Sequence, residues 1–185
     1  MCESWRFFSL NSTVSPLRTR MKLPGTVPPK PGMVLLDLFA GIGNFSLPLA
    51  AAGARVHAVE GSQGMVERLR ANAHNARDAD AVLAVSAEQA DLSNAEAVAK
   101  VLRQHPVDAL VLDPPRTGAG RAVVEAVAAS GASRIAYVAC DPAALGRDLG
   151  HARQAGLEVE RVVGFDAFGT THHLVAIATL RRARG

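Results

Sequence analysis

The sequence of 185 residues contains only two cysteines, Cys2 and Cys140. They provide neither a disulfide framework nor a cysteine cluster for zinc or an iron–sulfur centre, so we expect a reducing compartment and no metal. The sequence also lacks a run of about 18 apolar residues, which a membrane-spanning helix would need. Its first residues include Glu3 and Arg6 and lack the apolar core of a secretion signal. These absences predict a cytoplasmic protein without a membrane partner.

Strong charge of one sign is absent as well. A net charge of +3 and an isoelectric point of about 9.3 permit an anionic partner but fall short of a polybasic nucleic-acid clamp. With 49% hydrophobic and 20% charged residues, the composition is that of one globular domain. Prolines crowd the stretch from Leu23 to Gly32, which predicts a stiff linker. We therefore expect an N-terminal extension and linker over residues 1–32 and one domain over residues 33–185.

From Val34 onward, apolar strand-like runs alternate with helix-like stretches. The expected strands begin at Val34 and then cover Arg55–Val59, Ala81–Val85, Val107–Leu112, Arg134–Ala139, Leu157–Phe165 and His173–Leu180. The expected helices cover Asn44–Ala52, Ser62–Asn75, Ala95–Gln104, Arg121–Ala129 and Pro142–Gln154. This alternation predicts an α/β fold with an open, mostly parallel sheet covered on both faces. Only a loop separates the last two strands, so we expect them to form an antiparallel pair at one edge.

Two of the expected helices carry sequence signals for their ends and buried faces. Ser62 is a candidate N-cap, and Met65, Val66 and Leu69 are spaced to lie on one buried face. Asp141 is placed to cap the helix that begins at Pro142.

The turn after the first strand contains Gly41 and Gly43 and leads directly into a helix. Glycine permits backbone angles and close ligand approach that a Cβ would obstruct, and a helix start offers unpaired N–H groups, so the turn suits a nucleotide-like cofactor. Ser46 stands where a dinucleotide fingerprint has its third glycine. A tight strand-to-helix turn without a ligand explains the pattern equally well.

Polar residues also follow the later strands, at the sheet edge where ligands bind in open α/β folds. Glu60 could accept both hydroxyls of a ribose, or be a solvated surface charge. Asp113 could accept hydrogen bonds from a base edge or a cofactor amine and Arg116 could hold a phosphate, or the loop could be a proline turn with an incidental ion pair. Cys140 precedes a helix whose N–H groups favour a thiolate nucleophile, although most lone cysteines are small buried residues.

Taken together, a series of motifs resembles one family. The motifs are Leu36–Phe45, Val59–Gly61, Leu112–Gly118, Tyr137–Asp148, Asp166–Phe168 and Thr171–His173. Their order is similar to that in the catalytic domain of S-adenosylmethionine-dependent RNA uracil-5-methyltransferases, from about Met33 to the C-terminus. The resemblance implies a class I methyltransferase, Rossmann-like fold for residues 33–185.

The resemblance also implies a mechanism and a set of site residues. The family adds a cysteine thiolate to C6 of an unstacked uridine in transfer or ribosomal RNA, which makes C5 able to accept a methyl group; Cys140 matches this nucleophile. Asp113 is the second candidate catalytic residue. The residues expected to bind S-adenosyl-L-methionine are Asp37, Phe39, Gly41, Gly43, Asn44, Glu60 and Asp113.

This chain departs from the family pattern at three places. Members have a glutamate as the proton-abstracting base two positions after the histidine that matches His173, where this chain has Val175. Ser9 stands where members have a glutamine. Members also carry an N-terminal oligonucleotide-binding barrel and a central subdomain, for which this chain has no room. Either His172 or His173 replaces the base, or release is slow, or turnover is lost.

Two alternatives to the RNA uracil-5-methyltransferase therefore stay open. One is a non-catalytic or truncated remnant of the family that still binds the cofactor or RNA. The other is an amine methyltransferase, since an acidic residue followed by Pro-Pro also serves N-methylation. Such enzymes usually place an aromatic residue where this chain has Arg116, and they need no Cys140.

Overall fold

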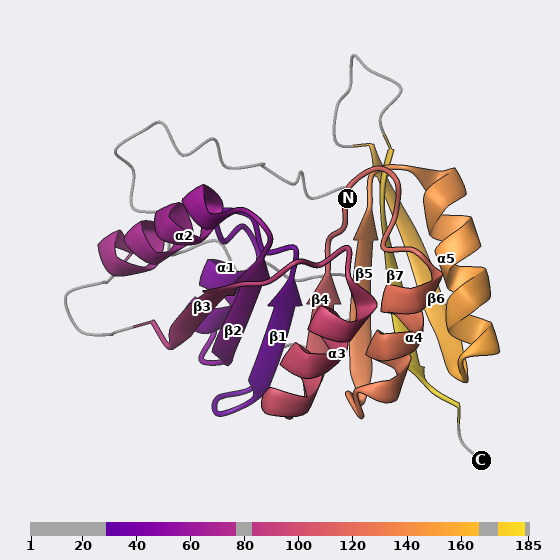
Figure 1. Cartoon of the computed structure of the whole chain (residues 1–185), viewed down its shortest axis with the longest axis horizontal. Helices are drawn as coiled ribbons and strands as arrows, with labels where there is room; N and C mark the ends of the chain where they lie inside the picture. Colours follow the sequence, from indigo (N-terminus) through magenta and orange to yellow (C-terminus); the bar gives the residue numbers. More distant parts are fainter. Residues whose placement is uncertain (1–28, 77–82, 167–173, 184–185) are drawn as a thin grey trace, which may run out of the picture.

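A computed structural model describes residues 29–76, 83–166 and 174–183. Its strands form one sheet in the order β3-β2-β1-β4-β5-β7-β6 (Figure 1). The strands are β1 (Val34–Leu38), β2 (Arg55–Glu60), β3 (Val85–Gln89), β4 (Ala109–Leu112), β5 (Arg134–Ala139), β6 (Leu157–Asp166) and β7 (Leu174–Arg182). The helices are α1 (Ser46–Ala51), α2 (Gln63–Asn75), α3 (Ala95–Gln104), α4 (Arg121–Ala129) and α5 (Pro142–Gln154).

The predicted open sheet with an antiparallel edge is confirmed. Strands β1 to β5 are mutually parallel, whereas β7 runs antiparallel to both β5 and β6. The chain builds β1, β2 and β3 outward in one direction and then crosses back through α3 to place β4 on the other side of β1. In open sheets of this kind, ligands bind in the crevice outside the carboxyl ends of the strands where the order reverses, which here are β1 and β4.

Helices cover the two faces of the sheet, and each strand distributes its side chains between them. Leu36 and Leu38 of β1 belong to the main core, which α3, α4 and α5 cover. Leu35 lies on the opposite face, with Leu49 of α1. Leu69 of α2 packs with Ala58 of β2 in a smaller cluster. Figure 1 shows α3 and α4 on the near side of the sheet.

Two sequence predictions about this fold were wrong. The third strand is β3, from Val85 to Gln89; of the expected run Ala81–Val85, Leu83 and Ala84 precede this strand, and Ala81 and Val82 lie outside the described residues. It is an edge strand that pairs with β2. Its apolar residues Val85 and Ala87 cover one face by packing beside Leu69 of α2. Met65 is 46% exposed and does not share the buried face of α2 with Val66 and Leu69.

The ends of the helices are fixed by local contacts. Asp141 caps α5 as predicted, because its side chain accepts a hydrogen bond from the Ala144 N–H. Asn94 does the same for α3, accepting from Glu96 and Ala97. Ser62 occupies the N-cap position of α2 but makes no capping hydrogen bond through its side chain. Among the described residues, no helix combines the length and apolar character needed to cross a membrane.

Candidate active site

The glycine turn closes β1 at the carboxyl edge of the sheet. Phe39, Gly41 and Gly43 have positive φ angles of 63°, 56° and 98°. A Cβ on Gly43 would come within 3.1 Å of Leu47 and 3.2 Å of Leu69, so this glycine lets the turn pack on α1 and α2. A Cβ on Gly41 would meet nothing within 4 Å. Gly41 therefore borders open space that a ligand can approach, while Phe39 adopts a left-handed conformation that is unfavourable for a residue with a side chain.

Glu60 joins this turn to the end of β2. Its Oε2 accepts a hydrogen bond from the Gly41 N–H at 2.9 Å, and its Oε1 accepts from the Ser62 N–H at 3.0 Å. A carboxylate offers about four lone-pair positions, so two backbone contacts leave room for ribose hydroxyls. Asn44 is exposed in the same turn. The structure thus brings Gly41, Asn44 and Glu60 to one edge, although they come from two strands.

Asp37 lies behind the turn. Its side chain is fully buried, and its Oδ2 accepts a hydrogen bond from the Ser46 hydroxyl at 2.6 Å. Within the described residues its Oδ1 has no hydrogen-bond partner. Burial is the main cause that raises the pKa of Asp37 to about 7. Because Asp37 has no exposed surface, it supports the turn from inside the protein through its hydrogen bond with Ser46. Its direct contact with a cofactor stays a prediction.

Asp113 stands across the crevice, directly after β4. Its N–H donates to the Leu38 carbonyl of β1 at 3.3 Å, and burial raises the pKa of its carboxyl to about 6. Pro114 is buried, whereas Pro115 and Arg116 are exposed. The loop therefore begins as part of the core and ends at the surface, which holds Asp113 at the mouth of the crevice.

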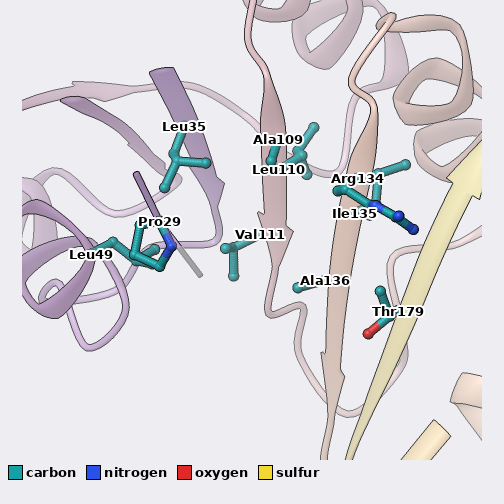
Figure 2. Close-up of a pocket in the computed structure, with 10 residues that line it drawn as sticks. All are labelled: Pro29, Leu35, Leu49, Ala109, Leu110, Val111, Arg134, Ile135, Ala136 and Thr179. Atoms are coloured by element: carbon teal, nitrogen blue, oxygen red, sulfur yellow. The ribbon is translucent and has the colours of Figure 1, made fainter. Parts of the chain in front are cut away.

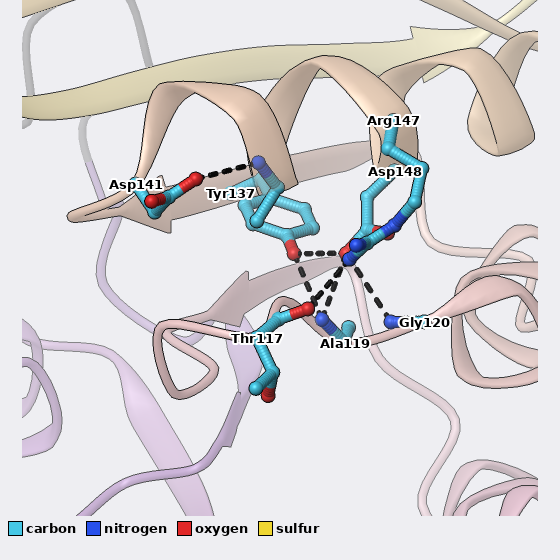
Figure 3. A network of polar contacts seen from close by, with 8 residues as sticks. Thr117, Ala119, Gly120, Tyr137, Asp141, Arg147 and Asp148 are labelled. Carbon is cyan, nitrogen blue, oxygen red and sulfur yellow. Dashed lines mark hydrogen bonds and ion pairs between the residues drawn. The ribbon is translucent and has the colours of Figure 1, made fainter.

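A polar network holds the rest of this loop against α5 (Figure 3). The buried Asp148 Oδ2 accepts hydrogen bonds from the Tyr137 hydroxyl at 2.6 Å, the Ala119 N–H at 2.8 Å and the Gly120 N–H at 3.2 Å. Arg147 lies 3.2 Å from Asp148 Oδ1 and donates to a loop carbonyl. Burial and the Asp148 hydrogen bond raise the pKa of Tyr137 above its ordinary value, so the hydroxyl stays a donor. We call Tyr137, Arg147 and Asp148 the loop clamp.

Gly118 is required for this clamp to close. Its φ is 80°, and a Cβ there would lie 2.5 Å from Asp148 Oδ2 and 2.6 Å from Arg147 Nη2. Local sequence patterns predict no role for the clamp residues beyond their place in the Tyr137–Asp148 motif. A carboxylate at a core-facing position of α5 and a tyrosine inside an apolar strand were available as signals, but their pairing depends on how α5 packs on the sheet.

Cys140 sits between β5 and α5, half-buried and with a free thiol. It follows β5, so it reaches the same carboxyl edge as the glycine turn and Asp113. The clamp ties the Asp113 loop to α5, the helix that begins two residues after Cys140. Val175 packs against an apolar pair, Val138 and Ile177, while His172 and His173 lie outside the described residues.

A small cavity lies apart from the candidate active site. It has a volume of about 30 Å³ and is lined by residues of β1, β4, β5, α1 and β7, including Leu35, Val111 and Ala136 (Figure 2). These side chains lie on the α1 face of the sheet, away from its carboxyl edge. The cavity has room for little more than ordered water.

The sheet order, the glycine turn and the acidic groups after β2 and β4 define a class I methyltransferase fold. Pyrococcus abyssi tRNA (uracil-54, C5)-methyltransferase, solved in complex with S-adenosyl-L-homocysteine, has a similar fold. The TM-score is 0.65 at 24% identity, over 83% of this chain and 35% of that one. Magnesium protoporphyrin IX methyltransferase of Synechocystis PCC 6803, solved with bound SAM, has a TM-score of 0.61 at 19% identity, over 83% and 71% of the two chains.

The sequence assigns the chain within this class. The family model described as tRNA (Uracil-5-)-methyltransferase matches residues 27–183, and the chain belongs to this family. It is 48% identical over 157 residues to a 23S rRNA (uracil(1939)-C(5))-methyltransferase of Halomonas elongata, covering 85% of this chain and 31% of that protein. A Pseudomonas aeruginosa protein with the same description is 43% identical over 172 residues, covering 93% and 37%. The chain thus spans about a third of the length of these curated relatives.

Proposed function

We propose that this chain is the catalytic domain of an RNA (uracil-5-)-methyltransferase that uses S-adenosyl-L-methionine and a covalent bond between Cys140 and uracil C6. One observation carries the proposal: the free, half-buried Cys140 lies at the same sheet edge as the glycine turn and Asp113. Family membership supports the uracil specificity, and the RNA-methylating activity named for the relatives supports RNA as the substrate.

The residues present fit the cofactor. Gly41 borders open space, Glu60 keeps lone pairs free beside it, and Asp113 directly follows β4 at the same carboxyl edge. We assign Gly41, Asn44 and Glu60 to the cofactor's nucleoside part and Asp113 to a polar hydrogen of the base or the amine. Asp37, Phe39 and Gly43 shape the turn. S-adenosylmethionine would supply an electrophilic methyl group for the C5 carbon.

Cys140 performs the addition and the release. Uracil C5 is a weak nucleophile, but a thiolate that adds to C6 moves electron density onto C5 and the O4 carbonyl, so that C5 can form a new bond to carbon. After that bond forms, a base removes the C5 proton, the electron pair restores the C5–C6 double bond, and the thiolate leaves. The uridine must be unstacked for the thiol to reach C6, which favours a loop or single strand of RNA.

A second candidate function rests on Val175. Its side chain is aliphatic and packs with Val138 and Ile177, so it cannot accept the C5 proton. If neither His172 nor His173 replaces the missing base, the chain would form the covalent adduct but release it slowly or never. This candidate keeps the cofactor site and Cys140 and loses only turnover.

The experiment compares the wild-type chain with Cys140→Ala, and uses Cys2→Ser as the matched control that removes the other cysteine. Each protein is incubated with S-adenosylmethionine and a short single-stranded RNA containing either uridine or 5-fluorouridine. Fluorine at C5 cannot leave as a proton, so the fluorinated RNA should remain attached to the protein. Mass spectrometry after denaturation detects 5-methyluridine and the site of the thioether, and calorimetry measures cofactor binding.

We expect the wild type and Cys2→Ser to be trapped on the fluorinated RNA at Cys140. Cys140→Ala should bind the cofactor normally and form neither adduct nor 5-methyluridine. Adduct with ordinary uridine and no free product would support the second candidate. Methylation by Cys140→Ala at the wild-type rate would overturn the covalent mechanism, and cofactor binding without adduct or product would overturn the catalytic proposal for this chain.

A further inference from the structure

Two histidines and a glutamate meet on the α3 face of the sheet, apart from the candidate active site. His57 lies on β2 and Glu88 on β3, where the register pairs His57 with Ser86 and Val59 with Glu88. His105 is the C-cap residue of α3. One potential ligand atom from each residue lies within 4.8 Å of the others. No motif spacing links them, because each residue belongs to a different element.

The polar atoms of the three side chains lie close together. His57 Nε2 lies 3.2 Å from Glu88 Oε1, and His105 Nε2 lies 3.8 Å from the same oxygen. The imidazole rings stack with centroids 3.7 Å apart and planes 21° apart. Yet His57 Nε2 and Glu88 Oε1 are buried and, among the described residues, neither has a hydrogen-bond partner with acceptable geometry. Two buried polar atoms this close need either a shared proton or a bound cation.

The contact of His57 with Ser86 suits a role as a metal ligand. Its Nδ1 lies 2.7 Å from the Ser86 hydroxyl, the kind of outer contact that orients a ligating ring. With the proton on Nδ1, the Nε2 lone pair faces the cluster. The carboxyl end of α3 adds a partial negative charge next to His105.

We propose that His57, Glu88 and His105 form a binding site for a divalent transition-metal ion, with Zn²⁺ as the best match. Zinc accepts imidazole nitrogen and carboxylate oxygen at about 2.0–2.2 Å, which places neighbouring ligand atoms of a tetrahedron roughly 3.3 Å apart. The 3.2 Å contact already has this spacing, whereas His105 must turn out of its stack with His57 before both rings can point at one ion; its side chain is 32% exposed at a helix end, which leaves room for that rotation. Water fills the fourth position.

Such a site would act on stability. It joins the end of α3 to the paired strands β2 and β3. An ion that binds the folded chain and not the unfolded one stabilises it in proportion to the logarithm of its concentration above the dissociation constant. The proposal is independent of the methyl-transfer proposal, since none of its residues lies at the carboxyl-edge turn or at Cys140.

The test is a titration of the metal-free chain with Zn²⁺ near pH 7.5, followed by calorimetry and thermal unfolding. Glu88→Gln and His105→Ala each remove one ligand, and His74→Ala removes an exposed histidine of α2 as the matched control. A parallel titration of Cys140→Ser excludes the thiol as the ligand. Co²⁺ replaces Zn²⁺ in a second series, because its visible absorption reports the coordination geometry.

We expect one Zn²⁺ per chain, a higher unfolding temperature on binding, and a dissociation constant at least about tenfold weaker in Glu88→Gln and His105→Ala. His74→Ala and Cys140→Ser should bind as the wild type does, and Co²⁺ should give the intense absorption of a four-coordinate site. Equal affinity in the wild type and Glu88→Gln would overturn the proposal. Absence of saturable binding in the wild type would also overturn it, and would leave the cluster as a proton-bridged ion pair.

Discussion

Replacing Asp37 with asparagine should make the stability of the chain much less dependent on pH. Burial is the largest cause that raises the pKa of Asp37 from 3.8 to about 7; the Ser46 hydrogen bond opposes this, while the charges of Asp113 and Glu60 raise the pKa further. In the unfolded chain the same carboxyl ionises near its ordinary pKa. At a pH between these two pKa values, Asp37 therefore carries a proton in the folded chain but not in the unfolded chain.

The sign and size of the effect follow from linkage. A carboxyl whose pKa is raised in the folded state gives stability that is complete below about pH 4 and is lost as the pH rises through about 7. One pKa unit corresponds to about 1.4 kcal/mol, so the whole loss from Asp37 is roughly 4 kcal/mol. Asp113, with a pKa of about 6, adds a loss of the same sign. Asparagine carries no charge and removes the contribution of Asp37.

Urea unfolding at pH 5 and pH 8, without cofactor, measures the effect. Relative to the wild type, Asp37→Asn should gain about 3 kcal/mol in the free energy of unfolding between the two pH values. Glu125→Gln is the control, because it removes an exposed carboxylate paired with Arg121, and its stability should run parallel to the wild type. If Asp37→Asn and the wild type change equally with pH, then Asp37 does not carry a raised pKa and the reasoning is refuted.

Other predictions concern the clamp and a helix cap. Gly118→Ala should lower the free energy of unfolding by about 2 kcal/mol or more, because it forces a Cβ at φ 80° against Asp148; an unchanged melting temperature would contradict this. Tyr137→Phe removes one donor to the buried Asp148 carboxylate and should lower stability by about 2 kcal/mol in urea unfolding, whereas no loss would show the bond to be dispensable. Asn94→Ala should lower stability by about 1 kcal/mol by removing the cap of α3, and Asn94→Asp should keep it.

Local signals along the chain were enough to predict most of the elements. The helices Ala95–Gln104, Arg121–Ala129 and Pro142–Gln154 and the strand Arg134–Ala139 have the predicted bounds. Periodicity, caps, glycines and prolines act over a few residues, so they can be read without knowing what packs on what. The same signals found the glycine turn, Glu60, Asp113 and Cys140 as groups that end strands. These signals did not predict where β3 begins, because the start of this edge strand depends more on its pairing with β2 than on its own hydrophobicity.

Tertiary structure alone decided how these pieces meet. The order of the strands, with β4 returning beside β1, places Asp113 opposite the glycine turn, and it depends on pairing between residues far apart in the chain. The contact of Asp148 with Tyr137 and the loop before α4 requires α5 to lie against β5. The meeting of His57, Glu88 and His105 is equally non-local. Each of these contacts joins groups that no periodicity connects, so only packing of the whole sheet and its helices brings them together.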